Sequence, residues 1–155
     1  MTYDVAELIA QTAALFFLTA WLTTGVFENL FQPDINRQFT SEVLDMTRMR
    51  EEFPEAYEQV AYRRISTPRT QRSLFRLIVF WEVLALCALW GGVGSMLAAI
   101  LSDYPTVEAK SFALIGTLMF TSIWAGFLIV GNWFCYWFCH EGAQTTHYHM
   151  TLWGV

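Results

Sequence analysis

Three long runs of apolar residues constrain the fold of this chain more than any other feature. They cover about residues 5–27, 74–101 and 112–138. A helix needs ~20 mostly apolar residues to cross the ~30 Å hydrocarbon core of a bilayer, and each run is long enough. Of the 155 residues, 55% are hydrophobic and 15% are charged, whereas a soluble domain carries about 25% charged residues. The sequence therefore predicts an all-α membrane protein of one domain, residues 1–155, with three transmembrane helices.

The distribution of charge predicts how the chain crosses the membrane. Lys110 lies after the second run, and every other basic residue lies between the first run and the beginning of the second: Arg37, Arg48, Arg50, Arg63, Arg64, Arg69, Arg72 and Arg76. Short segments rich in Lys and Arg stay in the cytoplasm, which predicts cytoplasmic positions for residues 32–73 and for a tail at 139–155. The N-terminus and a turn at 102–106 are then extracytoplasmic, and we expect a bacterial inner membrane.

Two further expectations follow from charge. Asp4 and Glu7 lie at the start of the first run, whereas a signal peptide begins with positive charge, so we expect this run to remain as a span. The net charge of −5 argues against nucleic acid as a partner.

The segment at about residues 36–66 is predicted to be helical. Five apolar residues in it recur at helical spacing and end before Pro54: Phe39, Val43, Met46, Met49 and Phe53. A second short helix is expected from Glu55 to Arg64. This amphipathic segment either lies in the membrane interface or over the bundle, or it forms a docking surface for a partner subunit.

Glu82 is the one acidic residue inside the second run, and Asn132 is the strongly polar residue of the third. A carboxylate in a membrane span is costly and usually faces protein or water. At ~1.5 Å per residue, each lies about 9 Å in from the same end of the bundle. We therefore predict a hydrogen bond between Glu82 and Asn132, either as an interhelical polar contact or as a proton or ligand site.

Cysteine and histidine residues near the C-terminus suggest a metal site as an alternative. They are Cys135, Cys139, His140, His147 and His149. Cys and His are good ligands for zinc and copper. Cys135 and Cys139 would share one helix face, and the last two histidines would lie close together in an extended tail. Against this, aromatic residues throughout 133–138 are typical of an interface belt, and buried cysteine behaves as a small apolar residue.

Several stretches of the chain resemble the domain-of-unknown-function (DUF) 2165 family of predicted small integral membrane proteins. These stretches are Asn29 with 33–36 and 43–47, then 80–82 leading into 89–91, and 130–137. The resemblance implies a small membrane protein and no particular activity. It also implies a glutamate where this chain has Asn132, so a shared proton between two membrane carboxylates is not expected here.

Three functions are consistent with these features. The first is a non-catalytic accessory subunit of a larger membrane complex, such as an energy-converting oxidoreductase or a membrane oxygenase. Small residues that let helices approach closely favour it: Gly91, Gly92, Gly94, Ser95 and Ala99. The second is a metal- or small-ligand-binding membrane protein that uses the C-terminal Cys/His region. The third is a small oligomeric transporter built around Glu82.

We expect neither an enzyme nor a cofactor, since no known catalytic motif is found. Bound lipids are expected, and copper or zinc is the alternative.

Overall fold

The computed structural model describes residues 2–155, and all regular secondary structure in this range is helical. The helices are α1 (Tyr3–Phe31), α2 (Pro33–Leu44), α3 (Thr47–Glu52), α4 (Pro54–Val60), the 3₁₀ turn η1 (Ala61–Arg63), α5 (Pro68–Leu101), α6 (Thr106–Trp133), α7 (Tyr136–Cys139) and α8 (Glu141–Trp153). Among them α1, α5 and α6 are long and apolar enough to cross a membrane. The predicted fold class, all-α with three candidate spans, is confirmed.

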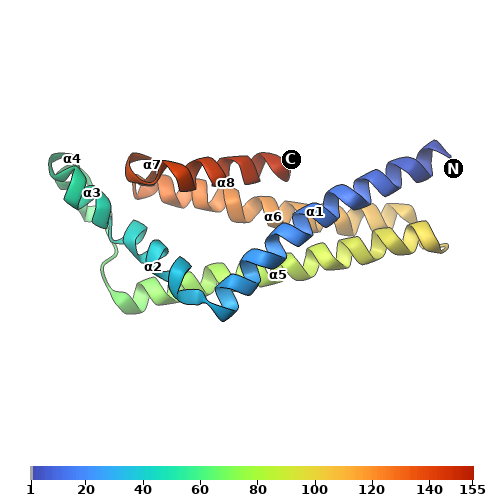
Figure 1. The fold of residues 1–155 in the computed structure, drawn as a ribbon, viewed down its shortest axis with the longest axis horizontal. Helices are drawn as coiled ribbons and strands as arrows, with labels where there is room; N and C mark the ends of the chain where they lie inside the picture. The colour runs from blue at the N-terminus through green and yellow to red at the C-terminus, as the bar shows by residue number, and fades with distance from the viewer. Residues whose placement is uncertain (1) are drawn as a thin grey trace.

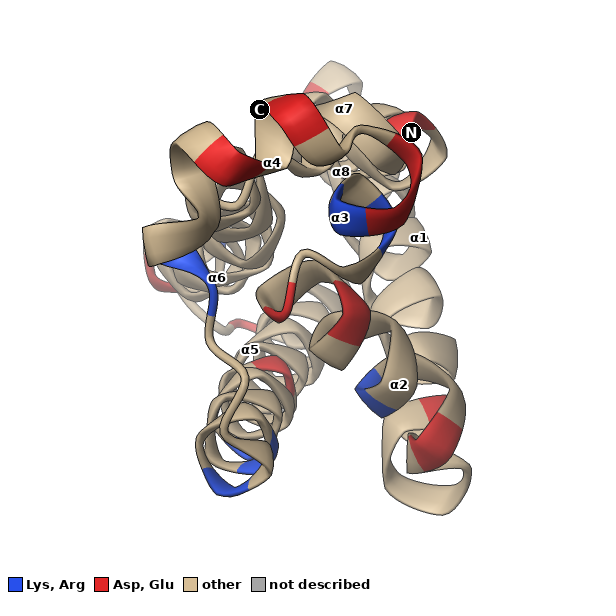
Figure 2. Ribbon diagram, turned by 90° about the vertical axis from the view of Figure 1, so that its left-hand side faces the viewer, with Lys and Arg blue, Asp and Glu red and all other residues tan. Residues whose placement is uncertain are grey.

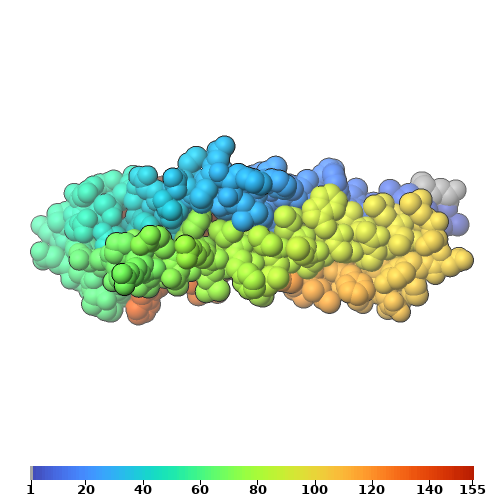
Figure 3. All heavy atoms as spheres, turned by 90° about the horizontal axis from the view of Figure 1, so that it is seen from below, coloured from blue at the N-terminus to red at the C-terminus, as the bar shows by residue number. Residues whose placement is uncertain are grey.

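The three long helices form an elongated bundle (Figure 1), and seen from below α5 lies between α1 and α6 (Figure 3). Both α1 and α6 pack along α5 and contact each other much less. The α1 side of the core is a helical stripe that includes Leu8, Leu15, Leu22 and Val26, each almost fully buried. Together with buried residues of α5 and α6, this stripe forms one apolar core.

Hydroxyl groups inside α1 are satisfied by the helix itself. Thr12 and Thr19 donate to the carbonyls of Leu8 and Leu15 at 2.7 and 2.8 Å. A buried polar group without a partner is costly, so this local bonding makes the threonines compatible with an apolar environment.

Two glycines allow α5 and α6 to approach closely. A Cβ on Gly92 would lie 2.9 Å from the Cα of Ala113, and a Cβ on Gly116 would lie 3.0 Å from the backbone of Leu89. Because the opposing atoms are backbone, they cannot move aside as a side chain would. The antiparallel α5–α6 contact therefore depends on the absence of side chains at these positions.

The segment between α1 and α5 is helical but more broken than predicted. We expected one helix through Phe39, Val43, Met46, Met49 and Phe53. Instead α2 ends at Leu44, and Met46 has a left-handed backbone with φ 52°. This kink buries Met46 and Met49 in a small cluster with Tyr57 and Phe134, and the burial explains why helical periodicity gives way there.

The third span ends earlier than predicted, and the tail is not extended. α6 ends at Trp133, and Cys135 again has a left-handed backbone, with φ 53°. The chain then turns back, because the ring of Tyr136 occupies the space that a side chain at Gly131 would need. Helix α8 runs back along α6 until Thr121 donates to the Gly154 carbonyl at 3.0 Å. It therefore lies at the same depth as the last half of that span (Figure 1).

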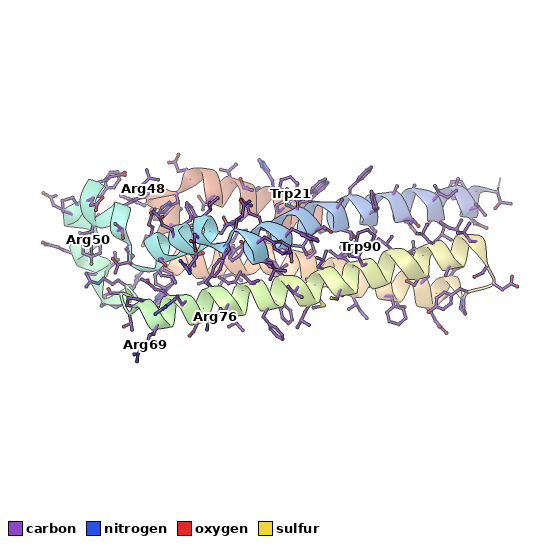
Figure 4. The ribbon with its side chains drawn as sticks, turned by 60° about the horizontal axis from the view of Figure 1, so that its bottom comes forward. Trp21, Arg48, Arg50, Arg69, Arg76 and Trp90 are labelled. Carbon is purple, nitrogen blue, oxygen red and sulfur yellow. The ribbon has the colours of Figure 1, made fainter. Side chains whose placement is uncertain are left out.

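The arginines gather at one end of the bundle. Figure 4 places Arg48, Arg50, Arg69 and Arg76 at the end formed by α2–α4 and the start of α5, and Trp21 and Trp90 nearer the middle. Viewed along the bundle from this end, both basic and acidic residues lie on α2 and α3, and acidic residues lie on α4 (Figure 2). We call this end the arginine-bearing end.

The close packing at Gly92 predicts a position-specific response to one added methyl group. Gly92→Ala should lower the apparent melting temperature in detergent, since overpacking against backbone costs about 1–3 kcal/mol. Gly94→Ala, two residues away, is the matched control, because a Cβ there meets nothing within 4 Å. It should leave the midpoint unchanged or raise it slightly. Circular dichroism gives the melting temperatures. Equal melting temperatures for the two variants would contradict this packing.

Candidate functional site

A chain of three polar side chains connects α1, α2 and α5 at the arginine-bearing end. The Asn29 amide donates to Oε2 of Glu82 at 2.7 Å, and the Asn36 amide donates to Oδ1 of Asn29 at 2.7 Å. Glu82 is 6% exposed and Asn29 is 9% exposed. These two hydrogen bonds link α1, α2 and α5 around the carboxyl group of Glu82.

The predicted contact between Glu82 and Asn132 is wrong. Asn132 lies in the last turn of α6 and is exposed. Equal depth in a bilayer does not bring two side chains together unless their helical phases also agree, and here they do not. Glu82 points into the chain instead of toward an outer face, which does not favour an oligomeric pore built around it.

Beside this polar chain lies a cavity of about 700 Å³. It is lined by residues of α1, α2, α5, α6 and the returning segment α7–α8 and is partly open to the outside. Glu82, Asn29, Tyr136 and His147 are among its polar lining residues. Most of the remaining lining is apolar or aromatic. A mostly apolar pocket of ~300–1,000 Å³ with a few polar groups is typical of a site for a small molecule.

The aromatic side of the cavity centres on His147 of α8. Its ring lies 4.8 Å from that of Phe127, 5.7 Å from that of Trp124 and 6.0 Å from that of Tyr136, measured between centroids. Burial lowers the pKa of His147 to about 4, so its imidazole is neutral at pH 7. Burial also raises the pKa of the Tyr136 hydroxyl.

The five residues of the predicted metal site are not brought together. Cys135 and His140 are buried, His149 is exposed, and within residues 2–155 no cluster of three His, Cys, Asp or Glu side chains is arranged to hold a metal ion. Cys135 and Cys139 do not share one helix, because the chain turns between α6 and α7. Burial raises the pKa of the Cys139 thiol and lowers the pKa of His140.

The apolar residues that we considered as a partner surface pack against the chain's own C-terminal segment. The Phe53 ring lies 4.7 Å from that of Phe138, and the Phe39 ring lies 5.1 Å from that of His140. Val43, Met46 and Met49 belong to the same small cluster. Part of the apolar surface of this segment is therefore used within the chain, while Phe39 and Phe53 remain 40% and 41% exposed.

One stripe on the outside of α5 lacks large side chains between residues 87 and 98, although Trp90 and Leu97 beside it are exposed. Cys87, Gly91 and Gly94 are exposed, and Ala98 continues the same face by helical spacing. A Cβ on either glycine would meet nothing within 4 Å. We call these four residues the α5 small-residue face.

The residues that complete the site carry only weak signals in the sequence. Asn29 follows directly after the apolar run at 5–27. No periodicity in the sequence distinguishes a buried position there from an exposed helix end. Residues Ala143, His147, Met150 and Gly154 share one face of α8 by spacing, which is the signal that could have identified this helix and the wall it forms.

Comparison with known proteins gives one match. The family described as predicted small integral membrane protein (DUF2165) matches residues 7–155. Neither the curated proteins nor the solved structures contain a match.

The Glu82–Asn29 bond can be tested against the contact that the sequence suggested. Asn29→Ala should destabilise the folded protein by about 1–3 kcal/mol, because it leaves a buried carboxylate without its donor. Asn132→Ala is the matched control and should change little, since Asn132 is exposed. Thermal unfolding in detergent gives both values.

A second comparison identifies the cause of that loss. Adding Glu82→Gln to Asn29→Ala should recover part of the stability, because the neutral amide is less costly to bury. A direct interaction would be contradicted if the loss of stability in the double variant equalled the sum of the losses in Asn29→Ala and Glu82→Gln.

His147 predicts a specific acid response. Its pKa is about 4 in the folded chain, below the ordinary histidine value of 6.5. The stability that the neutral ring supplies is thus complete above pH 6.5 and is lost as the pH falls toward 4. The melting temperature should fall more steeply over this interval in the wild type than in His147→Gln. The exposed His149 supplies the control, because His149→Gln should follow the wild type.

Proposed function

The chain belongs to the DUF2165 family of predicted small integral membrane proteins, and from this premise we propose that it is a non-catalytic accessory subunit. In this proposal it packs in the bilayer against a larger membrane protein, such as an energy-converting oxidoreductase or a membrane oxygenase. The α5 small-residue face is the observation that carries the proposal.

The contrast between α5 and α6 supports this assignment. On α6 the exposed positions are filled by large aliphatic side chains, among them Leu114, Ile115, Leu118 and Ile129. Such side chains suit contact with lipid tails. On α5, four small residues interrupt the exposed face over about 16 Å, given ~1.5 Å per residue. Large residues, Leu84 and Leu101, lie on the same face before and after them.

Small residues on a membrane helix allow another helix to approach its backbone. Helix association in lipid depends on such packing, since lipid tails are as apolar as leucine. Gly92 and Gly116 use this property inside the chain, at the α5–α6 contact. Gly91 and Gly94 have the same property but are not covered by residues 2–155, which favours a helix of another protein as their neighbour.

We further propose that the arginine-bearing end faces the cytoplasm. Eight arginines lie between residues 37 and 76 and one lysine lies at 110, and this asymmetry favours retention of the intervening segment inside the cell.

Native electrophoresis of the tagged protein, extracted from its own membrane with a mild detergent, tests the subunit proposal. The wild type should migrate in a complex larger than itself. Gly94→Leu should shift much of the protein to the free form, because the added side chain prevents close approach. Ala13→Leu, which makes the same kind of change at an exposed position of α1, should leave the complex intact.

Cys87 supplies a second readout on the same face. It is exposed, so a membrane-permeable reagent with one thiol-reactive and one photoreactive end should attach to Cys87 and, on illumination, to a C–H bond of the neighbour, and Cys87→Ser should abolish that product. Mass spectrometry of the product identifies the partner. Wild-type protein that migrates alone, with no Cys87-dependent product, would overturn the proposal.

A further inference from the structure

The cavity beside Glu82 is lined by acidic side chains and by no basic ones. The short helices and the start of α5 carry eight arginines together with acidic side chains, and no Arg or Lys is among the residues that line the cavity within 2–155. Its ionisable lining consists of Glu28, Glu82, Tyr136 and His147, and His147 is neutral at pH 7 because burial lowers its pKa to about 4. The cavity is therefore acidic as well as apolar.

The Glu82 carboxylate is only partly satisfied. Oε2 accepts the Asn29 amide at 2.7 Å, and no side chain of residues 2–155 is bonded to Oε1. A buried carboxylate is costly unless it is paired. A positively charged group in the cavity would supply the missing partner.

Aromatic rings surround the same space. The rings of the lining include those of Trp21, Phe39, Trp81, Trp124, Phe127 and Tyr136. The face of an aromatic ring attracts a cation, most strongly when the cation is desolvated, and quaternary ammonium groups are recognised in this way. Aromatic rings around one carboxylate thus suit a cation whose body is apolar.

We propose that this cavity binds lipophilic monocations, with Glu82 as the charged partner and the surrounding rings as the apolar and cation–π contacts. The volume of about 700 Å³ lies within the range of sites for small organic molecules. A phosphate-bearing lipid headgroup is not the ligand, because the lining offers no cation to hold it. The inference is independent of the proposed subunit role, since it concerns the isolated chain.

Two glycines in the lining allow a sharp test. Gly25 and Gly126 both face open space, and a Cβ on either meets nothing within 4 Å. Gly126→Leu should therefore fill part of the cavity without a clash with backbone. Gly94→Leu makes the same change outside the cavity, also in open space, and is its control.

The experiment is equilibrium dialysis of purified protein in detergent with tetraphenylphosphonium, with tetraphenylborate as a probe of similar size and shape but opposite charge. Quenching of tryptophan fluorescence should accompany binding, because Trp21, Trp81 and Trp124 line the cavity. We expect saturable binding of the cation at one site per chain and no saturable binding of the anion.

The variants assign the binding to the cavity. Glu82→Gln should weaken cation binding at least ~10-fold, as expected when a desolvated charge loses its partner, and Gly126→Leu should weaken it similarly. Gly94→Leu should bind as the wild type does. Melting curves show which variants are folded, and either cavity variant suffices if the other does not fold. Equal binding of cation and anion, or unchanged binding in a folded Glu82→Gln or Gly126→Leu protein, would overturn the proposal.

Discussion

The hydrogen bond from Asn29 to Glu82 is the interaction around which the arginine-bearing end is organised. A carboxylate inside an apolar bundle has no water to satisfy it, so the chain must provide donors. Asn29 can do so only because α1 continues to Phe31, beyond the apolar run, and because Asn36 of α2 holds its amide oxygen at 2.7 Å. The carboxyl group of Glu82 thus connects the last turns of α1 and, through Asn29, the start of α2 to α5 beside the cavity.

Helix α5 shows how one sequence serves two kinds of packing. Gly92 faces α6, and there a methyl group would meet backbone, whereas Gly91 and Gly94 on either side of it face outward into open space. At 100° per residue, neighbours in sequence necessarily point to different faces. Gly92 therefore belongs to the contact between α5 and α6, whereas Gly91 and Gly94 belong to the outer surface of α5, where no other residue of 2–155 packs against them.

The three spans could be predicted from the sequence because hydrophobicity over ~20 residues is a strong signal. The partner of Glu82 could not, since depth along a helix says nothing about its rotation, and Asn132 proved to point outward. Helix α8 was missed for another reason. Its contact face includes His147 and Met150, and the polar residues Gln144, Thr145 and Thr146 lie close to them in sequence. The apolar periodicity of this helix is therefore weak. Only the bend at Cys135, which sequence does not reveal, places this helix against α6.

The separation of charge at the arginine-bearing end also follows from helical phase. Arg69, Arg72 and Arg76 lie on one face of α5 and are exposed, while Gln71, Phe75 and Glu82 lie on another and are buried. Both sets follow the spacing of three to four residues that defines a helix face. The positive charge that favours one membrane orientation is thereby kept on the outside. The buried carboxyl group of Glu82 lies on the other face, so none of these arginines lines the cavity beside it.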